Sequence, residues 1–493
     1  MKIRLQGIGI IKDSEICLNG LTVITGQNNS GKTTVGKVLY SLIDAVSDLE
    51  ERATNDKALY MHKVIRNVRK NLTILNMLKR RISLAVARTI LDDYSTIYEI
   101  LYNYNSTFYN QKIRLDINEY ADKLVCELER FNVRSFFSTL VFQKILTQNI
   151  PGKFLEECEE EISKSIILLK HALKVTEQDS NLIEYSKESI NQTLRMEFSN
   201  QIQPVSIHSD KSVIEVKDET NNLLFYLEIS ENDIVNRGDT VFIRTPFRKS
   251  FFIDNPFILD TISNDFVFGQ SFVEKEYEVS GSFINNSRIM RHDEKLKEIL
   301  VRDKNKSVFE SLVPNYALIK IKSEIDKVLP GEFDFTPEGD FYIQNNKKLQ
   351  LSNLATGSKM FSIIKMLLEK GELDDTTVLI LDEPEAHLHP SWQNKFAEII
   401  VLLVKLLNVN VLLTSHSPNF VLAIDACMRK YEINDKTNFY QTRQLEDNSV
   451  KYMNVNHDIG EIYADFLQYL SEVKLLRDSF LKMDEDNEED EDD

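Results

Sequence analysis

Two short motifs about 350 residues apart constrain how this chain of 493 residues folds. Residues 26–33 read GQNNSGKT and directly follow the apolar run at residues 21–25. Residues 378–384 read VLILDEP, and residues 414–416 (TSH) follow a second apolar run. The first motif has the glycines and lysine that hold phosphates, and the second has carboxylates that hold a metal ion or activate water. Because the two halves complete one site, most of the chain is predicted to fold around it.

The composition is that of a globular protein large enough for two or three lobes. Hydrophobic residues make up 42% and charged residues 28% of the sequence, which is ordinary for such proteins. No apolar run reaches the 18 residues of a membrane span, and the chain opens directly into an alternating strand at residues 2–5. The four cysteines have no CxxC spacing. We therefore expect a cytoplasmic protein with no membrane association and no structural zinc.

Half of the net charge of −18 lies at the end of the chain, where residues 484–493 are nine acidic residues and one Asn. Such a block cannot bury a core, so we expect a disordered tail. The tail either aids solubility or mimics nucleic acid and screens basic patches elsewhere in the chain.

Changes in residue pattern predict an α/β fold, a mixed or parallel sheet with flanking helices and a large helical insertion. Residues 37–150 and 153–203 contain no Gly or Pro, and apolar residues there recur at helical spacing. We expect this insertion to form a compact bundle, with a two-stranded helical arm as the alternative. The predicted segments are a first part of the head at 1–45, the insertion at 46–202, a β-rich part at 203–284, a helical segment at 285–330, the rest of the head at 331–440, a strand and helix region at 441–483, and the tail.

The loop at residues 26–33 matches GxxxxGK[ST] between a predicted strand and a predicted helix. In such a loop, backbone N–H groups form a nest for phosphates, the Lys32 ammonium reaches the β- and γ-phosphates, and the Thr33 hydroxyl binds Mg²⁺. ATP and Mg²⁺ are therefore the predicted cofactors. The predicted phosphate-binding residues are Gly26, Asn28, Asn29, Ser30, Gly31, Lys32, Thr33 and Thr34.

Asp382 and Glu383 end a second buried strand. Asp382 is predicted to hold Mg²⁺ together with Thr33, and Glu383 to orient and deprotonate the attacking water. His416 follows the next strand, residues 409–414, and is predicted to point toward the γ-phosphate. The predicted activity is a slow or regulated ATPase with Lys32, Glu383 and His416 as its catalytic residues.

A loop of small residues, LATGSK at 354–359, precedes a predicted helix and is a further anion site. A phosphate loop, this loop, the LDEP carboxylates and a terminal His occur in an order that resembles the ABC-type ATPase heads of SMC, Rad50 and OLD-family proteins. Residues 385–390, EAHLHP, are similar to the OLD-like branch. The resemblance covers residues 1–45 and about 205–440.

The resemblance implies that two heads enclose two ATP molecules, as a homodimer or a higher even oligomer. The small-residue loop is then the signature loop, which contacts ATP held by the other copy, and residues 387–389 form the D-loop between subunits rather than a metal pair with Asp382. The implied signature residues are Ala355, Thr356, Gly357, Ser358 and Lys359, and the implied D-loop residues are His387, Leu388 and His389. Ala355 and Thr356 depart from the family's LSGGE pattern, and its Mg²⁺-binding glutamine has no evident counterpart.

The resemblance also implies candidate roles for the ATP cycle. OLD-family nucleases carry a C-terminal Toprim domain, whereas only 77 residues follow His416. We therefore expect a switch that controls a separate effector, a nuclease or toxin, as in the stand-alone ATPases of antiviral systems such as Septu or PARIS. The alternatives are a DNA repair or recombination ATPase and a nucleotide-gated scaffold with little hydrolysis.

Two basic stretches underlie the DNA alternative. Residues 57–91 carry nine Lys or Arg and no Asp or Glu, which forms either a surface that follows a phosphate backbone or an ordinary solvated helix face. A second stretch surrounds residues 246–247. The candidate nucleic-acid contacts are Lys63, Arg66, Arg69, Lys70, Arg244, Arg248 and Lys249.

Overall fold

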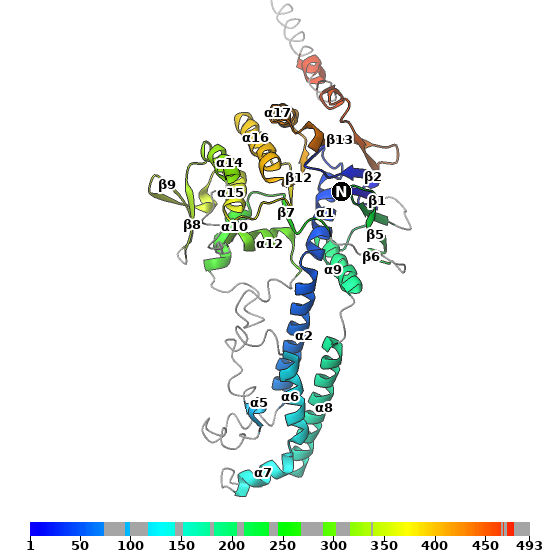
Figure 1. Ribbon diagram of the computed structural model, residues 1–493, viewed down its shortest axis with the longest axis vertical. Coiled ribbons are helices and arrows are strands. Elements are labelled where there is room, and N and C mark those ends of the chain that lie inside the picture. Colours follow the sequence, from blue (N-terminus) through cyan, green and yellow to red (C-terminus); the bar gives the residue numbers. More distant parts are fainter. Residues whose placement is uncertain are drawn as a thin grey trace, which may run out of the picture. The chain divides into compact units, whose positions relative to one another are not determined.

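The computed structural model describes residues 1–72, 94–98, 117–142, 151–177, 182–204, 212–235, 245–267, 289–301, 316–336, 339–464, 467 and 471–477. The chain forms two compact units (Figure 1). The first comprises Met1–Ser47, Ser186–Gly269 and Ile289–Asp493, and the second comprises Asp48–Tyr185 and Gln270–Arg288. Residues 186–202, expected in the insertion, thus belong to the first unit. Arg244 and the acidic residues 484–493 lie outside the described part.

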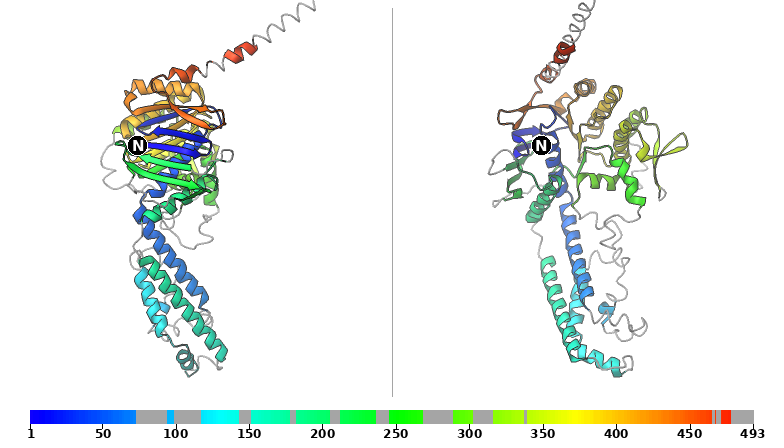
Figure 2. Two further views of the ribbon diagram at one scale, coloured as in Figure 1. Left: turned by 90° about the vertical axis from the view of Figure 1, so that its right-hand side faces the viewer. Right: turned by 180° about the vertical axis from the view of Figure 1, so that it is seen from behind.

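The described part of the first unit contains an eleven-stranded sheet, shown in Figure 2, with the order β6-β5-β4-β1-β2-β14-β13-β3-β12-β11-β7. The strands β13, β3, β12, β11 and β7 run parallel to one another, and most of the other pairs are antiparallel. The bounds are β1 Lys2–Ile8, β2 Ile11–Cys17, β3 Leu21–Thr25, β4 Ser212–Lys217, β5 Leu223–Ser230, β6 Asp233–Ile234, β7 Lys249–Ile253, β11 Thr377–Asp382, β12 Asn410–Ser415, β13 Thr437–Gln444 and β14 Val450–Asn454. The predicted mixed α/β fold is confirmed.

The central strands are buried on both faces because helices cover both sides of the sheet. Along β11, Val378 and Ile380 enter a core that includes residues of α1 (Lys32–Val46). Leu379 and Leu381 enter the opposite core, with residues of α15 (Thr356–Glu369), α16 (Pro390–Leu407) and α17 (Pro418–Lys430). A strand covered on both faces is expected to be a continuous apolar run, as the centres of β11 and β12 are, whereas the buried Thr22 interrupts the run of β3.

Of the remaining described elements of the first unit, several contribute side chains to the core that holds α15, whereas α9 places Ile190 and Leu194 in the core that holds α1. A three-stranded antiparallel sheet has the order β10-β9-β8. The bounds are α9 Leu182–Glu197, which begins in the second unit, α10 Ile258–Val267, α12 His292–Val301, α14 Tyr316–Asp326, β8 Glu332–Thr336, β9 Gly339–Gln344, β10 Lys347–Gln350, and the 3₁₀ turns η4 Leu351–Asn353 and η5 Asn434–Lys436.

In the second unit, three long helices share one apolar core. They are α2 (Leu49–Asn71), α6 (Ile117–Arg130) and α8 (Gly152–Glu177), and the short α5 (Ser95–Tyr98) and α7 (Val133–Phe142) add to them. Apolar side chains of α2, α6 and α8 repeat at helical spacing and meet in this core. The described helices therefore form a bundle rather than a two-stranded arm. Among the described helices, none is both long and apolar enough to cross a membrane.

A buried charged group ties three elements of the first unit together. The Nδ1 atom of His292 lies 2.6 Å from Glu197 Oε2, and its Nε2 atom lies 3.2 Å from Asp254 Oδ2. The backbone N–H of His292 also donates to Glu197 Oε1 at 2.8 Å. Burial alone would lower the pKa of His292, but the two carboxylates outweigh burial and raise this pKa to about 9.

Substituting His292 with Gln is expected to reduce the free energy of unfolding of the first unit in a pH-dependent way. Because the folded-state pKa of His292 is above its usual value of about 6.5, its charge stabilises the fold fully below pH 6.5, and this contribution disappears as pH rises through about 9. Wild type should exceed the variant by on the order of 1–3 kcal/mol at pH 6 and by less at pH 9.5.

Urea unfolding followed by fluorescence of Trp392, the one tryptophan of the chain, measures this difference in the first unit. His457→Gln is the matched control because His457 is exposed. A difference that stays constant between pH 6 and pH 9.5 would contradict the assignment of charge to His292.

Candidate active site at the carboxyl edge of the sheet

Four parallel strands end side by side at one edge of the sheet. In register, Ile24 of β3 lies opposite Thr414 of β12, which lies opposite Asp382 of β11. One residue earlier on β11, Leu381 pairs with Ile253, and this pairing brings the end of β7 to the same edge. In open parallel sheets this edge is where ligands bind, so both motifs meet at the place that strand pairing dictates.

The loop at residues 26–31 curls around the side chain of Lys32. The Lys32 Nζ atom donates to the carbonyl oxygens of Gly26 at 2.9 Å and Gln27 at 2.8 Å. Gly31 has a φ of 76°, which favours glycine, and α1 begins at the next residue. Asn28 and Asn29 are exposed, Ser30 is buried, and Thr33 and Thr34 begin the first turn of the helix. The loop therefore presents backbone N–H groups and a helix N-terminus at the sheet edge.

Thr33 and Asp382 meet directly across this edge. The Thr33 hydroxyl donates to Asp382 Oδ2 at 2.5 Å, and the Thr414 hydroxyl donates to Asp382 Oδ1. Burial raises the pKa of Asp382, and the nearby charges of Glu383 and Asp254 raise it further, against the two hydroxyl bonds. A carboxylate and a hydroxyl are hard oxygen ligands suited to Mg²⁺, and a cation here would offset the crowded negative charge.

Glu383 lies between a lysine and a histidine. Its Oε1 atom is 3.3 Å from Lys32 Nζ, and its Oε2 atom is 3.1 Å from His416 Nδ1. The backbone of Glu383 has a φ of 49°, and its N–H donates to the carbonyl and the hydroxyl of Thr414 at 3.2 and 3.1 Å. The structure thus brings together the three residues predicted to be catalytic. A left-handed backbone at such a position is held only where the surroundings fix it.

Comparison with known families places these features in context. Residues 1–421 match the model of the AAA ATPase domain. The chain belongs to this AAA ATPase family. It is therefore an ATPase of the AAA type.

Several solved structures of SMC heads resemble this ATPase weakly. The SMC head domain from Thermotoga maritima is 8% identical, with 92% of this chain and 98% of that chain covered and a TM-score of 0.34. The Smc head with a coiled coil and joint from Pyrococcus yayanosii is 12% identical, with 92% and 96% covered and a TM-score of 0.31. A Smc head from Pyrococcus furiosus bound to the C-terminal domain of ScpA is 10% identical, with 96% and 98% covered and a TM-score of 0.29.

The predicted signature loop of the AAA ATPase lies against the predicted D-loop. Helix α15 begins at Thr356, and an added Cβ on Gly357 would approach the carbonyl oxygen of His387 to 3.1 Å. Ala355 is exposed, Thr356 and Gly357 are half-buried, and Ser358 is buried. Only the first residues of this loop therefore face outward, next to His387.

Lys359 departs from the sequence expectation of a contact with a second subunit. Its side chain is buried, and its Nζ atom donates to Asp260 Oδ1 at 2.5 Å and to the carbonyl of Ser352 at 3.2 Å. The ammonium also lies 5.2 Å from the centre of the Phe257 ring. These contacts hold the Lys359 side chain within its own chain. The sequence did not predict them, because Asp260 lies on α10, an element that the sequence did not place beside α15.

The predicted D-loop residues have different environments. His387 is exposed and meets the Phe257 ring edge to face at 5.4 Å, whereas Leu388 is buried in the core. His389 caps α16, because its Nδ1 atom accepts from the N–H of Ser391 at 3.3 Å. Helix capping thus accounts for His389.

The sequence pattern did not predict two acidic residues at the site, Asp254 and Glu385. Asp254 directly follows β7, so the register places it beside Asp382. Burial favours its protonated form, yet the bond from His292 lowers the pKa of Asp254. Glu385 is buried and accepts from Ser415 Oγ at 2.5 Å and from the His416 N–H at 3.2 Å. Asp254 follows an apolar run as Asp382 does, and this similarity could have indicated Asp254 as a site residue.

The basic candidates lie on two elements. On α2, Lys63 and Lys70 are exposed while Arg66 and Arg69 are half-buried, and all four take part in interactions. The Nζ atom of Lys249 lies 3.1 Å from Glu372 and 3.4 Å from Asp374, so its charge is paired within the chain. The backbone N–H of Arg248 donates to the carbonyl of Thr376 at 2.9 Å.

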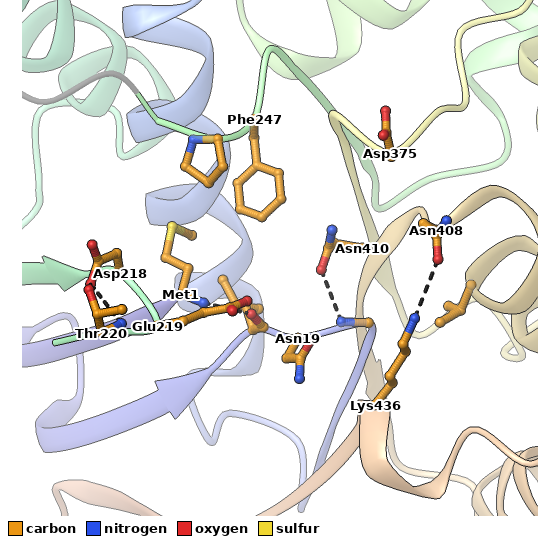
Figure 3. A pocket seen from close by; sticks show the side chains of 14 residues that line it. Met1, Asn19, Asp218, Glu219, Thr220, Phe247, Asp375, Asn408, Asn410 and Lys436 are labelled. Atoms are coloured by element: carbon orange, nitrogen blue, oxygen red, sulfur yellow. Dashed lines mark hydrogen bonds between the residues drawn. The ribbon is translucent and has the colours of Figure 1, made fainter. Parts of the chain in front are cut away.

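A cavity of about 510 Å³ lies at the opposite edge of the sheet, where β3 and β12 begin. Figure 3 shows its lining, in which Asn410 accepts from the Gly20 N–H and Lys436 donates to Asn408. None of the predicted site residues lines it. The predicted site residues therefore lie at the carboxyl edge and not around this cavity.

The phosphate loop rests on a hairpin beyond the family match. The Tyr452 hydroxyl of β14 donates to the carbonyl of Ser30 at 3.4 Å and lies against Gly31. Thr442 of β13 fills the space beside Gly26, where an added Cβ would approach its hydroxyl to 1.7 Å. Strands β13 and β14 thus complete the wall behind the loop.

Substituting Tyr452 with Ala is expected to weaken binding of a fluorescent ATP analogue about tenfold, because the loop loses the side chain whose hydroxyl contacts residues 30–31. Equilibrium fluorescence titration measures the dissociation constant. Tyr452→Phe should lose less affinity than Tyr452→Ala, because it removes the hydroxyl but keeps the ring that fills the space behind the loop. Met453→Ala is the control, since Met453 is the exposed neighbour. Unchanged affinity in Tyr452→Ala would show that the hairpin does not support the loop.

Proposed function

We propose that this AAA-type ATPase binds ATP with Mg²⁺ at the carboxyl edge and hydrolyses it. The observation that carries the proposal is the position of Glu383 between Lys32 and His416, beside the bonded pair of Thr33 and Asp382. Thr33 and Asp382 would hold Mg²⁺, which would neutralise charge on the β- and γ-phosphates.

In this proposal, Glu383 takes the proton of the attacking water, and Lys32 directs its ammonium at the phosphates. The two carbonyl bonds to Lys32 Nζ fix the ammonium inside the loop. His416 contacts the Glu383 carboxylate and would orient it as the water loses its proton. The N–H groups of residues 28–34 would bind the phosphate oxygens.

Glu383→Gln is expected to reduce phosphate release about 100-fold or more while ATP remains bound, because the amide cannot accept the proton of water. Lys32→Ala should instead abolish ATP binding. Phosphate release and titration with a fluorescent nucleotide measure the two effects separately.

Glu432→Gln is a matched control, because Glu432 is exposed and has a similar left-handed φ of 55°. Wild-type rates in Glu383→Gln would refute the assignment of the base. Wild-type protein that binds ATP but releases no phosphate would favour the nucleotide-gated scaffold.

We further propose that two copies, or a higher even number, close around ATP in the manner of OLD-like heads. The support is the adjacency of two segments that the resemblance assigns to the subunit interface. The exposed Ala355 and the first turn of α15 lie beside the exposed His387. The start of α15 has no side-chain cap, so its N–H groups are suited to phosphates of a second copy.

The proposed consequence of closure is control of a separate effector, a nuclease or toxin, in antiviral defence. This step rests on the resemblance to the OLD-like branch and to stand-alone ATPases of antiviral systems. DNA repair is the alternative, supported by the exposed Lys63 and Lys70 one above the other on α2. DNA-stimulated hydrolysis that is lost in Lys63→Glu/Lys70→Glu, but kept in the α8 control Lys153→Glu/Lys174→Glu, would favour that alternative.

Glu383→Gln with ATP and Mg²⁺ is expected to run as a dimer or larger even oligomer in size-exclusion chromatography with light scattering, because unhydrolysed ATP holds the copies together. Lys32→Ala should remain in the nucleotide-free state under the same conditions. Glu383→Gln tagged in its native host should then retain the effector, and Lys32→Ala should not. A monomeric Glu383→Gln, or one without a partner that depends on ATP, would count against the switch.

A further inference from the structure

Glu385 is a buried acidic residue that the proposed hydrolysis does not use. Its side chain is 2% exposed, and Oε1 accepts from both Ser415 Oγ and the N–H of His416. Its Oε2 atom is buried and has no hydrogen-bond partner in the described part of the chain. Burial raises the pKa of this carboxyl group. Burying such a group has a free-energy cost, which an apolar side chain of the same size would avoid.

The bonds of Glu385 act on the backbone that carries His416. The side chain of His416 is 42% exposed. Among the described residues, Glu383 is the one residue with which it forms an ion pair. The position of the imidazole therefore depends on its own backbone rather than on a surrounding pocket. Glu385 holds that backbone directly at the N–H of His416, and one residue earlier it accepts from the side-chain hydroxyl of Ser415.

The main chain of Glu385 holds the neighbouring segment, residues 386–389. Its carbonyl oxygen accepts from the N–H of Leu388 at 2.9 Å and from Gln393 Nε2 at 3.4 Å. Gln393 also donates to the carbonyl of Leu388 at 3.2 Å and accepts from Ser417 Oγ at 3.4 Å. Glu385 and Gln393 thus each form hydrogen bonds both to the segment at residues 386–389 and to residues 415–417.

We propose that Glu385 is a positioning residue that sets His416 against Glu383 and couples it to residues 386–389. The inference rests on the proposed function, in which His416 and Glu383 act on ATP and the exposed His387 faces a second copy. A displacement of residues 386–389 on assembly then reaches His416 through the Glu385 side chain, beside the second link that Gln393 makes to Ser417. Hydrolysis is thereby made to depend on the partner copy.

Two substitutions of similar size separate the hydrogen bonds from the packing. Glu385→Gln keeps an oxygen acceptor for Ser415 and His416, whereas Glu385→Met fills the space without one. We expect Glu385→Met to lower kcat for phosphate release about tenfold or more, and Glu385→Gln to stay within about threefold of wild type. ATP affinity, measured with a fluorescent analogue, should be unchanged in both. A purely structural role would lower stability and affinity without this split.

A double-substitution cycle tests whether Glu385 acts through His416. If it does, Glu385→Met/His416→Ala should have the same kcat as His416→Ala alone. Losses that multiply, or a wild-type kcat in Glu385→Met, would overturn the inference. Should Glu385→Met not fold, Ser415→Ala removes one of the two donors to Oε1. Ser415→Ala should lower kcat in the wild-type background but not in the His416→Ala background. If the two substitutions lower kcat by factors that multiply, the inference is refuted.

The same cycle distinguishes the inference from the proposed function. If His416→Ala and Glu383→Gln hydrolyse ATP as fast as wild type, the proposed function fails. If those two variants are impaired while Glu385→Met is not, only the role of Glu385 fails.

Discussion

The parallel pairing of β3, β12, β11 and β7 is the constraint on which the site depends. Because residues paired across parallel strands lie level with one another, the strand ends place Asp382, Thr414 and Asp254 along one edge of the sheet. The bond from Thr33 to Asp382 then joins residues 349 positions apart in the sequence. Apolar burial on both faces fixes this register, since a shift of one residue would turn core side chains toward the wrong layer. Packing energy thus aligns polar groups that would otherwise repel one another.

The sequence was sufficient to predict those parts of the site that depend on local pattern. A glycine loop after an apolar strand has one main structural interpretation, and two further apolar strands ending in Asp382 and in His416 must share its edge if the sheet is parallel. The predicted convergence of Lys32, Glu383 and His416 followed from that rule. Local pattern could not predict that β7 lies beside β11, because this pairing joins segments more than 120 residues apart. Asp254 was missed for this reason.

Lys359 and Glu385 show the same limit at the level of single side chains. Helical periodicity places Lys359 in the first turn of α15, but its direction is set by Asp260, 99 residues earlier. Glu385 lies in a run that the sequence presents as a surface loop, yet Leu388 anchors that loop in the core and draws Glu385 under the end of β12. Likewise, the support of residues 30–31 by Tyr452 depends on a strand order that places β14 between β2 and β13. Such contacts are decided by tertiary packing, which overrides local preference.

Two sets of buried ionisable groups in the first unit lie at the carboxyl edge of the sheet, a location that stability alone does not explain. His292 with Glu197 and Asp254 lies behind the end of β7, and Glu385 lies behind the end of β12. Apolar residues of equal volume would serve the core as well or better. Hydrogen bonds, however, fix direction as well as distance, whereas apolar contacts allow sliding. Groups that must meet a phosphate and a water at set angles gain from that directionality. These two sets of buried polar groups therefore lie where the sheet edge must be held in one arrangement.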